Sequence, residues 1–364
     1  MSAPQDFLNY KYYVHNLDPV LLPIYGNVGV RWYGLSYMVG FILSYFLIKW
    51  LCEKQKMGLT KDMVSDFVTY CAIGTMAGGR LGYCLFYSPD LFIKFKSDFP
   101  FWGVLAVNEG GMASHGGMIG IVIAAWLFAR KYGIPTLYLL DLVCICGPIG
   151  IFFGRIANFI NGELVGRPIQ SFVSWAVKFP TDILSWTAAD KDKFLSLTNV
   201  YQQLGGSPDQ WKTWVESMAF NHEAKNAVYS FMNRIIEETN KHNSAVLSAL
   251  EPLLTPRHPS QLYGALLEGF AVFVVLFLMW RTPKKLGVIA ASFGVLYSIA
   301  RVADEFYRMP DAHIGLQLFD LSRGQWLSIA LALISLILGI LWSRTVAIIC
   351  PGWGRVASIK LSRK

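Results

Sequence analysis

The sequence predicts an all-α integral membrane protein with seven transmembrane helices and an α-rich head domain on the outer surface of the membrane. Of its 364 residues 54% are hydrophobic and only 15% are charged, whereas about a quarter of a soluble domain is charged. Seven apolar segments are long enough to be candidate membrane spans. One long polar segment, residues 167–257, separates the fourth from the fifth.

Each candidate span is a run of apolar residues bounded by polar or charged ones. Charged residues interrupt the second, fourth, fifth and sixth, so their ends are the least sharply defined. The predicted spans are residues 32–48, 67–86, 110–129, 142–160, 260–280, 286–300 extended to 306, and 326–343. They divide the chain into an N-terminal outer-face segment (1–31), a first membrane part with four spans (32–166), a head domain (167–257), a second membrane part with three spans (258–345) and a basic cytoplasmic tail (346–364).

The basic residues of the short loops predict the orientation. One alternating set of loops carries 14 lysines and arginines, and the other carries 6. Since cytoplasmic loops are enriched in lysine and arginine, the N-terminus is expected outside and the C-terminus in the cytoplasm. The net charge of +8 is therefore attributed to cytoplasmic loops, and no nucleic-acid partner is expected. No cleavable signal peptide is expected, because the first apolar run begins only at Trp32.

The segment 167–257 is expected to form a small, partly helical domain. Parity places it outside the membrane. It contains Trp186, Trp211 and Trp214, and residues 216–250 have helical character. Residues 205–208 (Gly-Gly-Ser-Pro) predict a turn. None of the six cysteines lies in this segment, so a disulfide-stapled domain is not expected.

A dense group of polar residues marks the end of the fourth predicted span. Residues 154–167 read Gly-Arg-Ile-Ala-Asn-Phe-Ile-Asn-Gly-Glu-Leu-Val-Gly-Arg, so Arg155, Asn158, Asn161 and Glu163 lie in or beside one membrane helix. Polar and ionisable groups at membrane depth are costly and usually functional. A structural ion pair with helix-capping amides is the alternative, and the density of polar groups favours function.

The predicted topology places several polar residues in the outer half of the membrane. A helix rises 1.5 Å per residue, which puts Arg80, Arg155 and Arg301 roughly 20 Å above the cytoplasmic face and His115 within about 8 Å of the outer face. The residues expected in this layer are Tyr33, Arg80, His115, Arg155, Glu163, Arg301 and Glu305. Three arginines with internal counter-charges predict a site for an anion, and at headgroup depth that anion is a phospholipid phosphate.

Two of these residues have equally plausible structural roles. For Arg80 taken alone, a side chain that snorkels to the membrane interface explains its position as well as phosphate binding does. His115 lies in the glycine-rich stretch 110–117, which permits a broken helix beside a cavity, and its proton changes readily near neutral pH. A structural and a catalytic histidine are equally consistent with that setting. No metal-binding, P-loop or dinucleotide signature is present, so neither a metal nor a cofactor is expected.

These residues resemble the bacterial prolipoprotein diacylglyceryl transferase family. The stretch 154–166 fills every fixed position of that family's signature. Further blocks agree in order, and the resemblance covers roughly residues 30–345. They are Arg-Trp-Tyr-Gly-Leu at 31–35, Gly-Gly-Arg-Leu-Gly-Tyr at 78–83, the 110–117 stretch, Arg-His-Pro-Ser-Gln-Leu-Tyr at 257–263, and Arg301 through Glu305-Phe306-Tyr307-Arg308.

The resemblance implies a multi-pass enzyme of the bacterial inner membrane, with its N-terminus and head domain in the periplasm. The implied reaction transfers the diacylglyceryl group of phosphatidylglycerol to the thiol of the lipobox cysteine in a prolipoprotein signal peptide. A thioether forms and glycerol phosphate leaves, as the first step of lipoprotein maturation. The implied partners are phosphatidylglycerol, that signal peptide and membrane lipids.

The site expected from the motifs and the resemblance has two groups of residues. In the first group, the catalytic residues, Arg155 and Arg301 would hold the phosphate, and Tyr33 would orient lipid or peptide. The thiol would be activated either by His115 or by the field of the arginines. The expected catalytic residues are Tyr33, His115, Arg155 and Arg301. The expected substrate-binding residues are Arg80, Asn158, Asn161, Glu163, Gly166 and Glu305, of which the two glutamates more plausibly position arginines.

One departure from the family pattern and three competing functions stand beside this interpretation. The outer segment is longer than the family pattern leads us to expect, with the excess at about residues 181–256. A lipid or anion transporter would also hold cationic residues at depth, but it favours repeated halves and a site near the midplane, and the chain shows no repeat. A non-catalytic lipid-binding scaffold is the second competing function. The third is a phospholipid-using transferase with a different acceptor.

Overall fold

The computed structural model describes residues 10–25, 28–95, 97, 100–106, 110–187, 189–309 and 317–354. The chain is mostly helical, as predicted, and it divides into two compact units. Unit 1 comprises Met1–Ser36, Phe152–Leu267 and Ala300–Leu327. Unit 2 comprises Tyr37–Ile151, Glu268–Ile299 and Ser328–Lys364.

Each of the seven segments predicted as spans contains a helix. These helices are α1 (Trp32–Gln55), α2 (Lys61–Phe86), α3 (Ser114–Tyr132), α4 (Thr136–Ile160), the continuous run of α10 (Ser260–Gly264), η7 (Ala265–Ala271) and α11 (Val272–Met279), α12 (Val288–Glu305), and α13 (Arg323–Thr345). Within the described residues, four are long and apolar enough to cross a membrane: α1, α4, the run Ser260–Met279, and α13. The seven-span arrangement stays a prediction.

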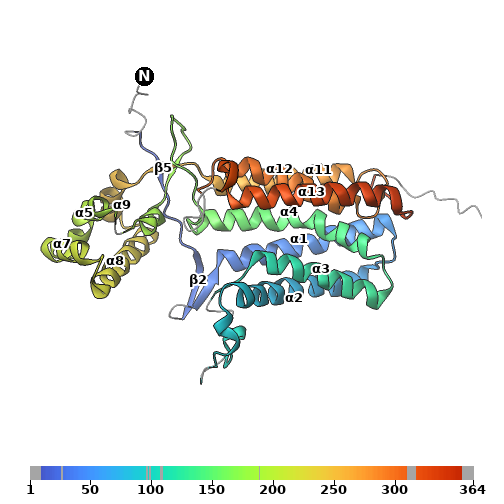
Figure 1. Cartoon of the computed structure of the whole chain (residues 1–364), viewed down its shortest axis with the longest axis horizontal. Helices are drawn as coiled ribbons and strands as arrows, with labels where there is room; N and C mark the ends of the chain where they lie inside the picture. The colour runs from blue at the N-terminus through green and yellow to red at the C-terminus, as the bar shows by residue number, and fades with distance from the viewer. Residues whose placement is uncertain are drawn as a thin grey trace, which may run out of the picture. The chain divides into compact units, whose positions relative to one another are not determined.

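In unit 2, α2 and α3 lie side by side along a seam of glycines (Figure 1). A Cβ atom added to Gly82 would lie 2.8 Å from the Cα of Gly116, and one added to Gly78 would lie 2.8 Å from the Cα of Gly120. Real Cβ atoms do not approach other atoms so closely, so glycine permits this distance between the two backbones.

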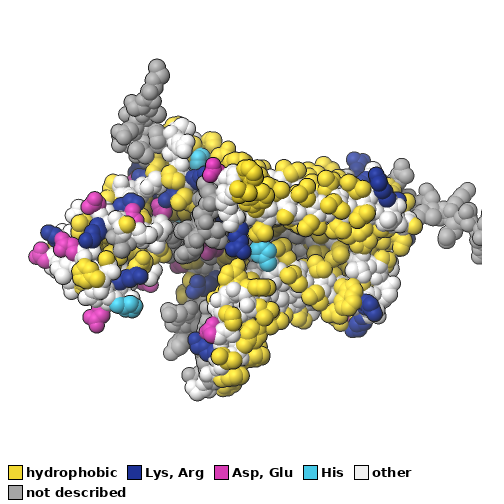
Figure 2. Space-filling model, in the orientation of Figure 1, with side chains coloured by type: hydrophobic (Ala, Val, Ile, Leu, Met, Phe, Trp, Pro, Cys, Tyr) yellow, Lys and Arg dark blue, Asp and Glu magenta, His cyan; other side chains and the backbone are white. Residues whose placement is uncertain are grey.

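The chain after α13 folds back in unit 2. Strand β7 (Ile349–Cys350) pairs with β6 (Lys284–Lys285), and the Trp353 ring stacks on Phe277 with 4.7 Å between centroids. In Figure 2 hydrophobic side chains cover most of the visible surface of the long helices, and lysines and arginines gather where α13 ends. This distribution is typical of a helical membrane protein.

In unit 1, short helices build a second hydrophobic core. They are η5 (Pro180–Ser185), α5 (Lys191–Ser196), α6 (Thr198–Gln203), α7 (Pro208–Ser217), α8 (His222–Asn240), α9 (Ser244–Leu250) and η6 (Glu251–Leu253). Trp211 is fully buried at the centre, where its ring lies 5.2 Å from Tyr201 and 4.9 Å from Phe231. Asn221 caps the N-terminus of α8 with its side-chain oxygen. The predicted turn at 205–208 separates α6 from α7.

Short strands also occur in unit 1, which the all-α prediction missed. Strands β1 (Tyr13–Val14), β4 (Val177–Lys178) and β5 (Pro256–Arg257) form a sheet in which β4 is central. Strands β2 (Val20–Tyr25) and β3 (Val28–Arg31) form a hairpin that leads directly into α1. The smaller 3-10 turns are η8 (Leu318–Asp320) in unit 1, and η2 (Pro89–Phe92) and η3 (Gly103–Leu105) in unit 2. Pairings of two residues are too short to show an alternating pattern in the sequence.

Candidate active site

The end of α4 is built so that Glu163 returns to Asn158. Gly162 adopts the left-handed conformation with φ of +63°. The Glu163 N–H donates to the carbonyl of Asn158 (3.1 Å) and the Gly162 N–H to that of Phe159 (2.9 Å). These are the two bonds of a Schellman motif, in which this position is usually glycine. As a result, the Asn158 side chain donates a 2.6 Å hydrogen bond from Nδ2 to Glu163 Oε1.

Tyr33 joins this pair from the first turn of α1. Asn158 Nδ2 also donates to the Tyr33 hydroxyl at 2.9 Å, and an amide nitrogen carries two protons for two such bonds. Asn158 is buried, whereas the Glu163 side chain reaches an exposed position. The structure therefore brings three predicted site residues into one hydrogen-bonded group, the Tyr33–Asn158–Glu163 triad.

The loop after α4 is fixed by the first residues of α10. Gln261 Nε2 donates to the Glu163 carbonyl at 2.7 Å, and Ser260 Oγ donates to the Leu164 carbonyl at 3.1 Å. Leu164 has a positive φ of +55°, an uncommon backbone conformation for such a residue. The loop that the sequence predicts to be functional is thus held in place by polar side chains from another part of the chain.

Gly166 lies where three chain segments meet. A Cβ atom added to Gly166 would collide with the carbonyl oxygen of His258 and lie 2.8 Å from that of Tyr307. Gly166 also forms a bridge with Arg308, and its carbonyl accepts a 3.1 Å hydrogen bond from Arg257. Only glycine fits this position without displacing backbone.

Arg257, which the sequence analysis did not assign to the site, forms a buried ion pair beneath this loop. It donates to both carboxylate oxygens of Asp182 over 2.8–3.0 Å. Such two-pronged pairs add geometric specificity to their energy. The pair fixes the start of the Arg257–Tyr263 block. The sequence had identified this block only as a motif.

The second cationic centre lies at the end of α12. Arg301 pairs with Glu305 at 2.6 Å and with Asp304 at 3.1 Å, and Arg301 is mostly buried. Glu305 Oε1 also accepts a 2.8 Å hydrogen bond from Ser322 Oγ. Sequence reasoning found Glu305 but missed Asp304, although its spacing of three residues from Arg301 on a helix was the available signal.

Arg155 and Asn161 occupy separate positions on the last turns of α4. The Arg155 side chain runs beside Gly264, where an added Cβ would lie 3.1 Å from Arg155 Nε. The buried Oδ1 of Asn161 has no hydrogen-bond partner among the described residues. Both belong to unit 1, with Tyr33, Asn158, Glu163, Gly166, Arg301 and Glu305.

Arg80 and His115 belong to unit 2. The buried guanidinium of Arg80 donates to four backbone carbonyls of the segment between α2 and α3. His115 is the second residue of α3 and is exposed. The convergence of all predicted residues on one layer of the membrane stays a prediction.

An aromatic group beside the loop was also missed. The Tyr263 hydroxyl accepts a 2.7 Å hydrogen bond from Trp175 Nε1 and lies 3.2 Å from His258 Nδ1. The Tyr307 ring lies 5.2 Å from the imidazole of His258. Burial lowers the pKa of His258, which favours a neutral ring that accepts the Tyr263 proton at Nδ1.

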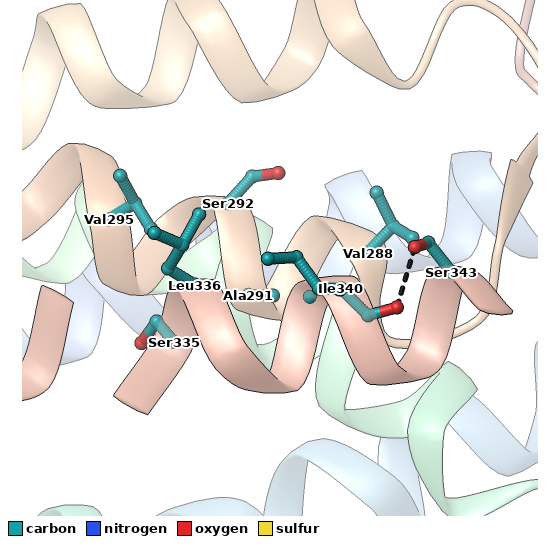
Figure 3. Close-up of a pocket in the computed structure, with 9 residues that line it drawn as sticks. Val288, Ala291, Ser292, Val295, Ser335, Leu336, Ile340 and Ser343 are labelled. Atoms are coloured by element: carbon teal, nitrogen blue, oxygen red, sulfur yellow. Dashed lines mark hydrogen bonds between the residues drawn. The ribbon is translucent and has the colours of Figure 1, made fainter. Parts of the chain in front are cut away.

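One cavity in unit 2 is apolar. A groove of about 200 Å³ runs between α12 and α13, where Val288, Val295, Leu336 and Ile340 face it (Figure 3). None of the predicted site residues lines it. Among the described residues, no group of three or more histidine, cysteine or acidic side chains is placed to hold a metal ion.

Comparison with known proteins shows which family this chain belongs to. The family model for prolipoprotein diacylglyceryl transferase matches residues 19–341. The phosphatidylglycerol–prolipoprotein diacylglyceryl transferase of Bdellovibrio bacteriovorus is 56% identical over 351 residues, which is 96% of this chain and all of that protein. The enzymes of the same name from Neisseria gonorrhoeae and Idiomarina loihiensis are 36% and 35% identical, over 89% and 88% of this chain and 95% and 92% of theirs. The chain therefore belongs to the prolipoprotein diacylglyceryl transferase family.

Proposed function

We propose that this chain transfers the diacylglyceryl group of phosphatidylglycerol to the thiol of the lipobox cysteine in a prolipoprotein signal peptide. In this reaction the thiolate attacks the glyceryl carbon, the carbon–oxygen bond to phosphate breaks, and glycerol phosphate leaves with the bonding electrons. The observation that carries the proposal is similarity to enzymes of that name over almost the whole chain.

Arg155 and Arg301 stabilise the leaving phosphate in this proposal. Negative charge grows on the phosphate oxygens as the carbon–oxygen bond breaks, and prearranged guanidinium groups lower the energy of that state. Glu305 and Asp304 hold Arg301 in place through the 2.6 Å and 3.1 Å ion pairs. Their role is to orient Arg301, not to attack the substrate.

The Tyr33–Asn158–Glu163 triad orients the substrates. Its two hydrogen bonds hold a buried amide at the C-terminal end of α4. Asn161 lies in the next turn with its buried Oδ1, and Gly166 fixes the loop that follows. Together they shape the surface against which the lipid headgroup or the signal peptide lies.

Two routes activate the thiol, and they predict different pH profiles. A free thiol has a pKa of about 8.5, so few molecules are thiolates near neutrality. Either His115 accepts the proton, or the field of the arginines lowers the thiol pKa. If His115 is the base, H115Q removes the acidic limb of the activity profile and slows transfer; unchanged turnover across pH assigns activation to the arginines.

The enzyme is proposed to span the inner membrane seven times, with the N-terminus and residues 167–257 in the periplasm and the C-terminus in the cytoplasm. The excess of lysine and arginine in one set of loops supports this orientation. Single cysteines introduced at exposed Lys212 in α7 and Lys54 in α1 test it. An impermeant maleimide should label the first and not the second in intact cells whose outer membrane has been permeabilised.

The direct test combines purified protein, phosphatidylglycerol and a lipobox peptide with one cysteine. Mass spectrometry should detect a diacylglyceryl mass gain on the peptide and released glycerol phosphate. Both should be lost in R155A and retained in R344A, which removes a basic residue in the last turn of α13. A folded protein that gives neither product excludes the proposal, and lipid movement across vesicles would then test for a transporter.

A further inference from the structure

Arg80 is surrounded by carbonyl oxygens. Its Nε donates to Val104 at 2.8 Å and its Nη2 to Gly103 at 2.7 Å. Its Nη1 donates to Gly110 at 2.5 Å and to Gly111 at 2.9 Å. The residue is only 5% exposed. One guanidinium therefore joins two separate parts of the segment between α2 and α3.

The number of donors limits what else Arg80 can bind. A guanidinium has five N–H groups, and four of those of Arg80 are directed at these carbonyls. Two-pronged recognition of a phosphate needs two parallel N–H groups. A phosphate bound in that way would have to displace at least one carbonyl of Gly103, Val104, Gly110 or Gly111.

The carbonyls that Arg80 holds lead directly into α3. Gly110 and Gly111 have positive φ values of +84° and +80°. Two residues later the Ala113 N–H donates to the Gly79 carbonyl at 2.9 Å, and α3 begins at Ser114. His115 is therefore four residues from a carbonyl bonded to Arg80, in the first helical turn.

Tyr83 completes this support. The Arg80 guanidinium carbon lies 5.8 Å from the centre of the Tyr83 ring. A Cβ atom added to Gly111 would lie 2.5 Å from the same ring and 2.9 Å from Arg80 Nη1. A Cβ atom added to Gly110 would meet nothing within 4 Å. Gly111 is thus packed against Arg80 and Tyr83, and Gly110 is not.

We propose that Arg80 is a positioning residue that sets the start of α3, and so the place of His115, instead of binding the lipid phosphate itself. This inference rests on the proposed transferase function, with His115 acting in the reaction. It revises the expectation that Arg80 binds substrate directly. The distinction matters because a displacement of about 1 Å at a reacting group slows catalysis by roughly 100-fold.

Kinetics of R80Q, H115Q and the double variant test the inference. We expect R80Q to lower kcat by about 100-fold while changing KM for phosphatidylglycerol by less than about twofold. In the H115Q background R80Q should cost less than about threefold, since both changes disable the same group. A large rise in KM in R80Q would overturn the inference, and so would losses of kcat that add up in the double variant. A low kcat in R80Q together with a near-normal kcat in H115Q would also overturn it.

Two glycine variants provide a matched pair if R80Q does not fold. G110A and G111A impose the same unfavourable positive φ, but only G111A presses a methyl group against Arg80 and Tyr83. G111A should lower kcat at least about 10-fold more than G110A, with KM again unchanged. Equal losses would overturn the inference. Absence of transfer by the unaltered protein would instead reject the proposed function.

Discussion

Asn158 Nδ2 donates a 2.6 Å hydrogen bond to the carboxylate of Glu163 across the turn that ends α4. The bond depends on amide chemistry, because only a donor at position 158 faces the carboxylate favourably. N158D should therefore lower kcat by about 100-fold, since it places two carboxylates in contact and removes the donor to Tyr33. N226D on α8, in the helical part of unit 1, is the control and should retain activity. Equal activity of both variants in the peptide assay would contradict the role proposed for the triad.

The Arg301–Glu305 ion pair predicts a graded series. E305Q keeps the shape and an acceptor for Ser322, but it removes the negative charge 2.6 Å from Arg301. We expect kcat to fall by about 10-fold in E305Q and by about 1000-fold in R301A, because the second variant removes the residue proposed to bind the phosphate. Steady-state rates at saturating phosphatidylglycerol provide the measurement. A loss in E305Q as large as that in R301A would instead indicate direct chemistry by Glu305.

The core around Trp211 should determine the stability of the helices between residues 191 and 250. Trp211 is fully buried, whereas Phe220 is 83% exposed in the turn before α8. W211A should destabilise this region by about 3–5 kcal/mol, and F220A should change it by less than about 0.5 kcal/mol. Hydrogen exchange of α7 and α8 amides reports both. Similar protection in the two variants would be inconsistent with this core.

His15 should make the stability of unit 1 depend on pH. Its ring lies 5.4 Å from both Phe159 and Phe179, and burial lowers its pKa from 6.5 to about 4. The unfolded chain therefore binds the proton more tightly, so stability present above pH 6.5 is lost as the pH falls toward 4, by about 2 kcal/mol at pH 5. The drop in unfolding temperature between pH 7 and pH 5 should be smaller in H15F than in the unaltered protein. His222 is exposed, so the control variant H222F should show the same drop as the unaltered protein. Identical acid shifts in the unaltered protein and H15F would contradict the prediction.

The sequence predicted best where a residue acts through its neighbours along the chain. The end of α4 is one example, because Asn158, Gly162 and Glu163 lie within six consecutive residues and their spacing encodes the motif. Each of the seven apolar segments also contains a helix, since a long apolar run is a local signal that the sequence carries directly. Their ends differ by several residues where charged residues such as Lys61 and Asp62 begin a helix.

The sequence predicted least where partners are distant and have no pattern. Arg80 bonds to carbonyls 23 to 31 residues away, and a backbone carbonyl carries no side-chain signal in a sequence. From its chemistry alone, an arginine can bind a phosphate as readily as it can bind the carbonyls of a loop. The pair of Arg257 and Asp182 is separated by 75 residues, and the two-residue strands beside it were missed for the same reason.

The pairing of β7 with β6 has a practical consequence for handling this protein. The Trp353 indole donates to the Phe277 carbonyl at 2.7 Å, and the Gly354 N–H donates to that of Arg281 at 3.1 Å. A purification tag attached after Lys364 leaves these bonds untouched. Truncation before Ile349 would remove strand β7 and the indole that packs at the end of α11. Phe277 would then be exposed, and we expect the protein to aggregate in detergent. The shortest expression clone should therefore end no earlier than Gly354.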